Sequence, residues 1–187
     1  MRLVLATFAL ALAVGYLRGG RLANVAGIHV RWAPAAMIGL AMQFAPVPGR
    51  TLPLAMLLAS FVLLTVFAAV NIRLVGFPLI ALGICCNFLV IAVDHGMPVT
   101  RHALTASGQE STLRLLIQRG GAKHHLATSA DELLFLGDVI PLGPIQQAVS
   151  LGDVLTYAGV MWLIVAAMRR RDEQPAAPRR EVRHAEG

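Results

Sequence analysis

Long apolar stretches with almost no charge inside them constrain the fold of this chain more than any other feature. The clearest one runs from Leu52 to Ile72 and contains no Asp, Glu, Lys or Arg. An apolar stretch of about 18 residues or more matches a helix that crosses a hydrocarbon layer roughly 30 Å thick. Only 14% of the 187 residues are charged, whereas about a quarter are charged in soluble domains. The sequence therefore predicts an integral membrane protein.

We expect an all-α membrane protein with about five transmembrane helices. Prolines and glycines delimit the stretches, because proline is tolerated in the first turn of a helix and ends one that it follows. The third and fourth stretches are separated by a very tight turn, which predicts an antiparallel helical hairpin. The predicted spans cover about residues 3–17, 32–47, 52–72, 74–93 and 151–168.

The first stretch admits two interpretations. Arg2 precedes a short apolar segment, as in a secretory signal peptide that is later removed. The small residues Ala11 and Ala13 fall too early for a cleavage site, however, and Arg18 ends the stretch with a charge. We expect an uncleaved first helix, with a cleaved signal peptide as the alternative for residues 1–17.

Basic residues near the helix ends predict the orientation in a bacterial plasma membrane. The positive-inside rule places the side richer in Lys and Arg in the cytoplasm. With five spans, this rule predicts the N-terminus outside, the C-terminus inside and residues 94–148 as an extracytoplasmic loop. The residues near helix ends on the predicted cytoplasmic side are Arg18, Arg21, Arg31, Arg73, Arg169, Arg170, Arg171, Arg179, Arg180 and Arg183, against Arg2, Arg50 and Arg101 outside.

The outer loop is expected to be partly structured and to pack on the outer face of the bundle. Residues 133–141 are strongly apolar but too short to span, so we expect them to fold back over the helices like a lid. Residues 111–118 have a partly apolar helical face suited to the membrane surface. Residues 169–187 are basic, lack apolar periodicity, and are predicted to form a disordered cytoplasmic tail.

Polar side chains within the spans are the best candidates for a site, because they are costly in lipid and tend to face a cavity. Gly83, Asn87 and Asp94 fall on one stripe of the fourth helix. Such a stripe serves either close helix packing or a polar pocket that opens outward. Asp138 in the apolar loop segment and Asp153 at the start of the fifth helix could join the pocket. The proposed outer pocket is therefore Asn87, Asp94, Asp138 and Asp153.

Two of these acids have simpler roles as alternatives. Asp153 follows Ser150 at a helix start, where hydroxyl and carboxylate groups satisfy free backbone N–H groups. Asp138 in Gly137–Pro141 is typical of a turn aspartate that binds its own backbone.

No catalytic residue, cofactor site or metal site is predicted. His95, His102, His124 and His125 lack the spacing of known metal motifs, and the adjacent Cys85 and Cys86 have neither zinc-ligand nor redox spacing. Phosphate-binding and nucleophile motifs are also absent from the sequence. The net charge of +6 follows from basic residues at the helix ends and in the tail, so nucleic acid is not an expected partner.

Several short motifs together make the chain resemble the DUF5317 family of uncharacterised bacterial membrane proteins. They lie after the first helix (18–21), between the third and fourth (71–76), around Asn87 and 96–99, at 123–124, at 136–141 and at 150–153. One departure is Asp94-His95 before Gly96, where an Asn-Gly type of sequence is expected. The resemblance implies a bacterial membrane protein and no particular activity.

Three functions are compatible with these features. The first is a non-enzymatic binding, accessory or scaffold component whose partners are the lipid bilayer and either another membrane protein or a second copy. The alternatives are a small transporter or channel component and an envelope enzyme acting on a lipid or lipid-linked substrate at the outer face. Convergence of Asn87, Asp94, Asp138 and Asp153 in one cavity would favour a site, whereas dispersed side chains would favour packing and capping.

Overall fold

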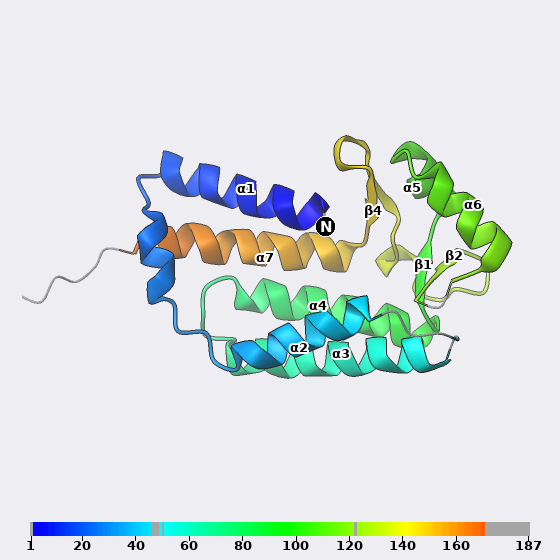
Figure 1. The fold of residues 1–187 in the computed structure, drawn as a ribbon, viewed down its shortest axis with the longest axis horizontal. Coiled ribbons are helices and arrows are strands. Elements are labelled where there is room, and N and C mark those ends of the chain that lie inside the picture. The colour runs from blue at the N-terminus through cyan, green and yellow to red at the C-terminus, as the bar shows by residue number, and fades with distance from the viewer. Residues whose placement is uncertain (1, 46–48, 50, 122, 171–187) are drawn as a thin grey trace, which may run out of the picture.

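The computed structural model describes residues 2–45, 49, 51–121 and 123–170. Its main body consists of five apolar helices that lie along a common direction (Figure 1). Their residue ranges lie close to those of the five predicted apolar helices, with small shifts at the ends. The helices are α1 (Arg2–Leu17), α2 (Ala33–Phe44), α3 (Thr51–Val70), α4 (Phe77–Val93) and α7 (Leu151–Met168).

The helix ends follow local backbone chemistry. The fourth helix was predicted from residue 74 but begins at Phe77, because Gly76 adopts a left-handed φ of 86° and Pro78 occupies the first turn. The second helix ends at Phe44, before Pro46 in the sequence. Its predicted last residues, 46 and 47, lie outside the described residues, as does the predicted disordered tail from residue 171 onward.

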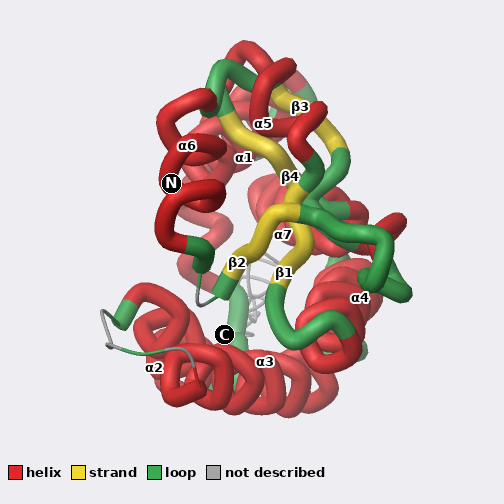
Figure 2. The backbone as a smooth tube through the Cα atoms, turned by 90° about the vertical axis from the view of Figure 1, so that its right-hand side faces the viewer, coloured by secondary structure: helices red, strands yellow, loops and turns green. Residues whose placement is uncertain are grey.

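The helices form a row in which the extensive contacts run α2–α3–α4–α7–α1. Helices α1 and α2 therefore lie at the two ends of the row, on either side of the concave face (Figure 2). Phe61, Phe77 and Ile84 contribute to the buried core between α3 and α4. The rings of Phe67 and Phe77 meet edge to face, with centroids 5.5 Å apart.

Small residues allow α4 and α7 to approach each other most closely. A Cβ atom on Gly152 would lie 2.6 Å from the carbonyl oxygen of Gly83. A Cβ atom on Gly159 would lie 2.6 Å from the carbonyl oxygen of Gly76. Both distances are too short for any side chain, so the two helices touch through their backbones at two glycine contacts. Close packing through small residues is typical of helices that associate in lipid.

The five helices also expose many apolar side chains on the surface of the bundle. Helices α3 and α7 are long and apolar enough to cross a membrane, although only 33% and 28% of an 18-residue stretch in each are buried in the protein. Helices α1, α2 and α4 are apolar but shorter. The large exposed apolar side chains include Leu5, Met37, Phe44 and Trp162. The core helix of a soluble protein would bury more of its surface.

Residues 94–150 cover one end of the bundle, which we call the covered end. They contain the short helices α5 (Arg101–Ala106) and α6 (Glu110–Arg119). Strand β1 (Met97–Val99) pairs in parallel with β2 (His124–Leu126), and β3 (Ile140–Leu142) pairs antiparallel with β4 (Gln147–Val149). The all-α expectation is therefore wrong for this segment. Prolines within β1 and β3 disfavour helix there and favour extended backbone.

The apolar segment 133–141 packs against the bundle. Its Leu136 is buried in the same cluster as Ile91 at the end of α4 and Met97 of β1. Phe135 was expected to be buried but is 65% exposed, because it lies in the short 3-10 helix Leu134–Leu136, whose tight turn directs neighbouring side chains apart.

Candidate functional site

A cavity of about 500 Å³ lies on the concave face of the helix row, directly below residues 94–150. Its polar lining comes from α2, α4, α7 and the covering segment, and its apolar lining from helices α1 to α4, β1 and Ala148. The polar residues are Gln43, Asn87, Lys123, His124, Asp138, Gln147, Asp153 and Tyr157; the apolar residues are Val4, Leu5, Leu40, Phe44, Leu57, Phe61, Ile91, Met97 and Ala148.

Asn87 belongs to a closed hydrogen-bond network that joins α4 to the start of α7. Its Nδ2 donates to Oδ1 of Asp153 at 2.8 Å, and its Oδ1 accepts from the hydroxyl of Ser150 at 2.7 Å. The Ser150 Oγ in turn accepts from the backbone N–H of Asp153 at 2.9 Å. Ser150 is thus the N-cap of α7, as the capping interpretation expected. The network also orients the Asp153 carboxyl.

Backbone hydrogen bonds place Asp138 beside β1. Its N–H donates to the carbonyl of Pro98 at 2.9 Å, and its carbonyl accepts from the N–H of Thr100 at 3.3 Å. The carboxyl is 12% exposed and lines the cavity. In the described part of the chain, no side chain or backbone group donates a hydrogen bond to this carboxyl. Every fully enclosed side-chain nitrogen or oxygen atom there has a hydrogen-bond partner. The Asp138 oxygens are therefore accessible from the cavity.

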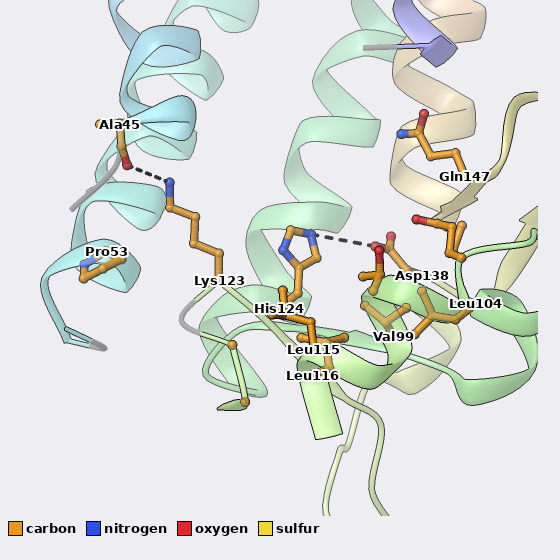
Figure 3. Close-up of a pocket in the computed structure, with 15 residues that line it drawn as sticks. Ala45, Pro53, Val99, Leu104, Leu115, Leu116, Lys123, His124, Asp138 and Gln147 are labelled. Atoms are coloured by element: carbon orange, nitrogen blue, oxygen red, sulfur yellow. Dashed lines mark hydrogen bonds and ion pairs between the residues drawn. The ribbon is translucent and has the colours of Figure 1, made fainter. Parts of the chain in front are cut away.

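His124 faces this carboxyl, with Nε2 3.8 Å from Oδ2 of Asp138 (Figure 3). Burial and the nearby Asp153 carboxyl raise the pKa of Asp138 well above its ordinary value. The His124 side chain is 54% exposed and lines the cavity. Enclosure by the surrounding protein, Lys123 and His125 lower the pKa of His124. Both shifts favour the uncharged forms of the pair.

Lys123 connects the covering segment to the end of α2. Its ammonium donates to the carbonyl oxygen of Gln43 at 2.6 Å. It also donates to the carbonyl oxygen of Ala45 at 3.4 Å (Figure 3). Lysine is favourable there because the last carbonyls of a helix are free and carry partial negative charge. A second cavity of about 520 Å³ lies between α6 and the ends of α2 and α3, and also touches Lys123, His124 and Asp138. The two cavities therefore adjoin at these residues and at Gln147 and Ala148, which also line both.

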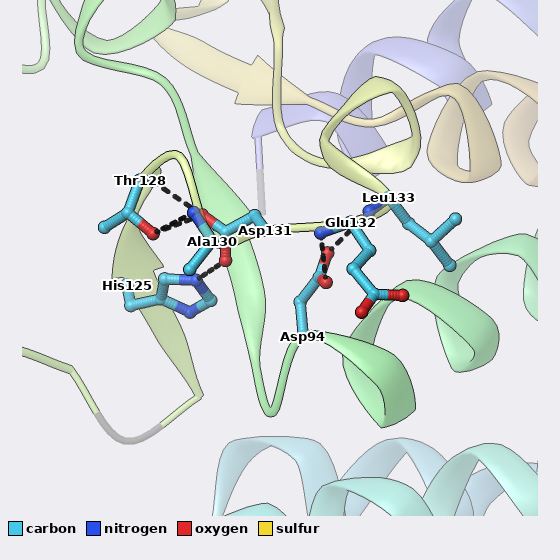
Figure 4. A network of polar contacts seen from close by, with 7 residues as sticks. All are labelled: Asp94, His125, Thr128, Ala130, Asp131, Glu132 and Leu133. Atoms are coloured by element: carbon cyan, nitrogen blue, oxygen red, sulfur yellow. Dashed lines mark hydrogen bonds and ion pairs between the residues drawn. The ribbon is translucent and has the colours of Figure 1, made fainter.

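Asp94 does not share the cavity with the other three predicted residues. It follows the last residue of α4 and turns away from the helix stripe. Its carboxylate accepts from the backbone N–H groups of Glu132 at 2.8 Å and Leu133 at 3.2 Å (Figure 4). The structure thus brings Asn87, Asp138 and Asp153 together, while Asp94 anchors the covering segment.

A second acid–histidine pair lies outside the cavity. His125 Nε2 is 2.7 Å from Asp131 Oδ1, and Asp131 also accepts from the N–H of Thr128 at 2.6 Å (Figure 4). Burial works against ionisation of Asp131, but the hydrogen bonds from Thr128 and His125 outweigh it and lower its pKa. The described residues contain no group of three His, Cys, Asp or Glu side chains placed to hold a metal ion.

Sequence reasoning did not include Lys123, His124 or Gln147 in the pocket. For Lys123 and His124 the only signal was a Lys-His-His run in a polar loop, which is common by chance, and Gln147 carried no signal. Lys123 and His124 reach the cavity because β2 pairs with β1, more than twenty residues earlier in the chain. Tyr157, one turn after Asp153 on α7, was recognisable from helical spacing.

Comparison with known proteins shows to which family the chain belongs. A family model of unknown function, DUF5317, matches residues 27–165. The chain belongs to the DUF5317 family. The resemblance inferred from its motifs is thereby confirmed, and the matched region includes every residue of the network around Asn87. Neither a curated protein nor a solved structure matches the chain.

Proposed function

We propose that this DUF5317 member spans the bacterial plasma membrane five times and binds the polar head of an amphiphile in the cavity at its covered end. The N-terminus and the covered end lie outside, and the C-terminus lies inside. The role is non-enzymatic binding. The five apolar helices with outward-facing side chains support the membrane location.

The distribution of arginines supports the orientation. Arg18, Arg31, Arg73 and Arg169 follow or precede helix ends away from the covered end, where cytoplasmic charge is expected. In a background without Cys85 and Cys86, a membrane-impermeant thiol reagent should label Ser111→Cys in α6 and leave Ala176→Cys unlabelled. The reverse labelling pattern would contradict the orientation.

One observation carries the binding proposal: Asn87, Asp138 and Asp153 converge on a cavity whose remaining wall is apolar. Binding sites for small molecules combine a largely apolar lining with a few convergent polar groups. The apolar wall includes Leu5 of α1 and Phe44 of α2, which are 67% and 73% exposed. Because α1 and α2 are the ends of the helix row, an apolar chain can leave the cavity between them toward lipid.

Blocking the cavity tests this proposal. Leu40 lines the cavity and is 49% exposed, whereas Met37 on the same helix is 71% exposed and does not line it. Protein purified in a neutral detergent should retain an amphiphile that native mass spectrometry detects. Leu40→Trp should reduce the retained amphiphile, and the matched control Met37→Trp should not. Equal retention by the two variants, or none by the wild type, would contradict the proposal.

The geometry also favours a second candidate, an envelope enzyme that acts on a lipid-linked substrate. A carboxyl with a raised pKa beside an imidazole can donate a proton to a leaving group, and Asp138 and His124 have this arrangement. The enzyme hypothesis predicts that the retained amphiphile is chemically converted during incubation and that Asp138→Asn stops the conversion. Pure binding predicts an unchanged mass.

A further inference from the structure

The charged groups around the cavity are not paired with one another. Asp138 and Asp153 contribute two carboxyl groups, and Lys123 contributes an ammonium. The Lys123 ammonium, however, donates to the carbonyl oxygens of Gln43 and Ala45 at the end of α2. Among the described residues it forms no ion pair with either acid. The Lys123 ammonium is therefore bound at the end of α2 and does not neutralise Asp138 or Asp153.

His124 does not supply the missing charge. Its Nε2 lies 3.8 Å from the Asp138 carboxyl, which is beyond hydrogen-bond distance. Its lowered pKa keeps the ring largely neutral at neutral pH. Two acids thus face one cavity and repel each other when ionised.

We infer that the cavity takes a cationic head group, a primary ammonium held between the carboxylates of Asp138 and Asp153. This inference rests on the proposed binding function and names the class of amphiphile. An ammonium carries three N–H donors. The Asp138 carboxyl has no hydrogen bond within the described chain. The Asp153 carboxyl accepts from the Asn87 amide and lies beside the Ser150 N–H and hydroxyl, which leaves part of its acceptor capacity free. The ammonium would fill these vacant acceptor positions and neutralise the repulsion between the acids.

Other head groups fit the cavity less well. A neutral polyol could form hydrogen bonds with the two carboxyl groups but would bring no positive charge to stabilise their ionised forms. An anionic phosphate would be repelled by the ionised carboxyl groups, and the Lys123 ammonium, which could attract it, already donates to the end of α2. The apolar wall of Leu5, Leu40 and Phe44 requires that the ammonium be joined to a hydrocarbon chain. The ligand class is therefore an amphiphile with a primary amine in its head group.

The network around Asn87 is suited to position one of the two acids. Asn87 is bound at both ends of its amide, to Asp153 and to Ser150, and is 6% exposed. The hydrogen bond from Asn87 thus holds the Asp153 carboxyl at the start of α7. Pre-organisation of this kind favours binding, because the ligand does not have to order the side chain.

The test compares three amphiphiles that share one chain and differ in the head. Full-length protein in a neutral maltoside detergent is titrated with dodecylamine, dodecyl phosphate and 1-O-dodecylglycerol, with binding followed by native mass spectrometry. Dodecylamine should bind at least about tenfold more tightly than the other two. Asp138→Asn and Asp153→Asn should each weaken dodecylamine binding by about tenfold or more, since a tenfold change corresponds to 1.4 kcal/mol. The matched control, Glu132→Gln, removes an exposed charge outside the cavity and should change nothing.

The outcomes separate this inference from the proposed function. Asp138→Asn keeps the size of the side chain, and its thermal unfolding checks that it folds. If the three amphiphiles bind equally, or if dodecyl phosphate binds best, and Leu40→Trp abolishes that binding, the ammonium inference is wrong and amphiphile binding stands. Loss of dodecylamine preference only in Glu132→Gln would also overturn the inference. If none of the three binds, both proposals fail.

Discussion

The two glycine contacts between α4 and α7 have the same packing but different surroundings. At the end away from residues 94–150, Gly159 meets Gly76, and the neighbouring Ile80 is apolar. At the covered end, Gly152 meets Gly83 beside the amide of Asn87. Both contacts bring backbone against backbone at the same short distance. At the contact between Gly159 and Gly76, the helices therefore approach closely without a polar side chain.

This difference separates packing from site formation. If hydrogen bonds were needed to hold α4 against α7, the apolar contact at Gly76 would require them too. The contact at Gly76 forms without such hydrogen bonds. The network of Asn87, Ser150 and Asp153 therefore has a role besides holding the two helices together. It caps α7 and orients a carboxyl toward a cavity that also contains the unbonded Asp138.

The largest effect is expected from breaking either contact. Gly159→Leu and Gly83→Leu should both destabilise the protein at the upper end of the range of about 1–3 kcal/mol for overpacked cores, or prevent folding. Gly27→Leu is the control, because nothing lies within 4 Å of a Cβ atom there. Thermal unfolding in detergent and size-exclusion chromatography measure the outcome. Normal stability in Gly159→Leu would show that the close approach is dispensable.

A smaller effect is expected from the polar network alone. Asn87→Leu should lower stability by about 1–3 kcal/mol, because it removes the donor to the Asp153 carboxyl and the acceptor of the Ser150 hydroxyl. Replacing Asp153 by Leu as well should recover part of the loss, with a coupling of about 0.5–3 kcal/mol in a double-mutant cycle. Strictly additive effects would mean that Asn87 and Asp153 act independently. The contact at Gly83 would then not differ from the contact at Gly76 by a coupled polar network.

The next effect is a pH dependence that comes from Asp138. Its pKa is raised above the ordinary value of 3.8 in the folded protein, so ionisation opposes folding. Wild-type stability should therefore fall relative to Asp138→Asn as the pH rises from 3.8 through the folded-state pKa, and the difference should then stay constant. Unfolding temperatures of both proteins between pH 4 and 8 provide the measurement. A rise of wild-type stability relative to the variant over this range would contradict the assignment.

The smallest effect is expected at Asp131, where the sign is opposite. Hydrogen bonds from Thr128 and His125 outweigh burial and lower its pKa, so this acid stabilises the fold above its unfolded pKa of 3.8. That contribution is lost as the pH falls through the lower folded-state pKa. At pH 7, Asp131→Asn should speed hydrogen exchange in residues 124–128 and leave dodecylamine binding unchanged. Protection of these amides equal to wild type would show that the pair contributes nothing.

Helix positions were accessible from the sequence because each apolar stretch is ended by local chemistry. Residues 151–168 were predicted and found as α7, where Ser150 supplies the N-cap. The fourth helix was predicted three residues too early, because Gly76 takes a left-handed conformation that a hydropathy pattern does not reveal. The strands of the covering segment were missed since each contains only three residues.

The candidate site was accessible only in part. Helical spacing placed Asn87 correctly but failed for Asp94, since that residue lies just past the last helical residue, where the stripe no longer applies. Lys123 and His124 depend on the pairing of β2 with β1, and Asp138 depends on its bonds to Pro98 and Thr100. Contacts between such distant segments leave no periodic signal in the sequence.

The sequence by itself determined where the apolar helices lie, to within a few residues, and at which ends the arginines lie, because hydropathy and helix capping depend on neighbouring residues. The tertiary structure alone decided which polar groups are satisfied. Asn71 donates to the Arg31 carbonyl and accepts from the Arg31 N–H, whereas Asp138 faces a cavity with no hydrogen bond within the described chain. Both are polar residues beside apolar stretches. They differ because hydrogen-bond partners come from segments that only folding brings together.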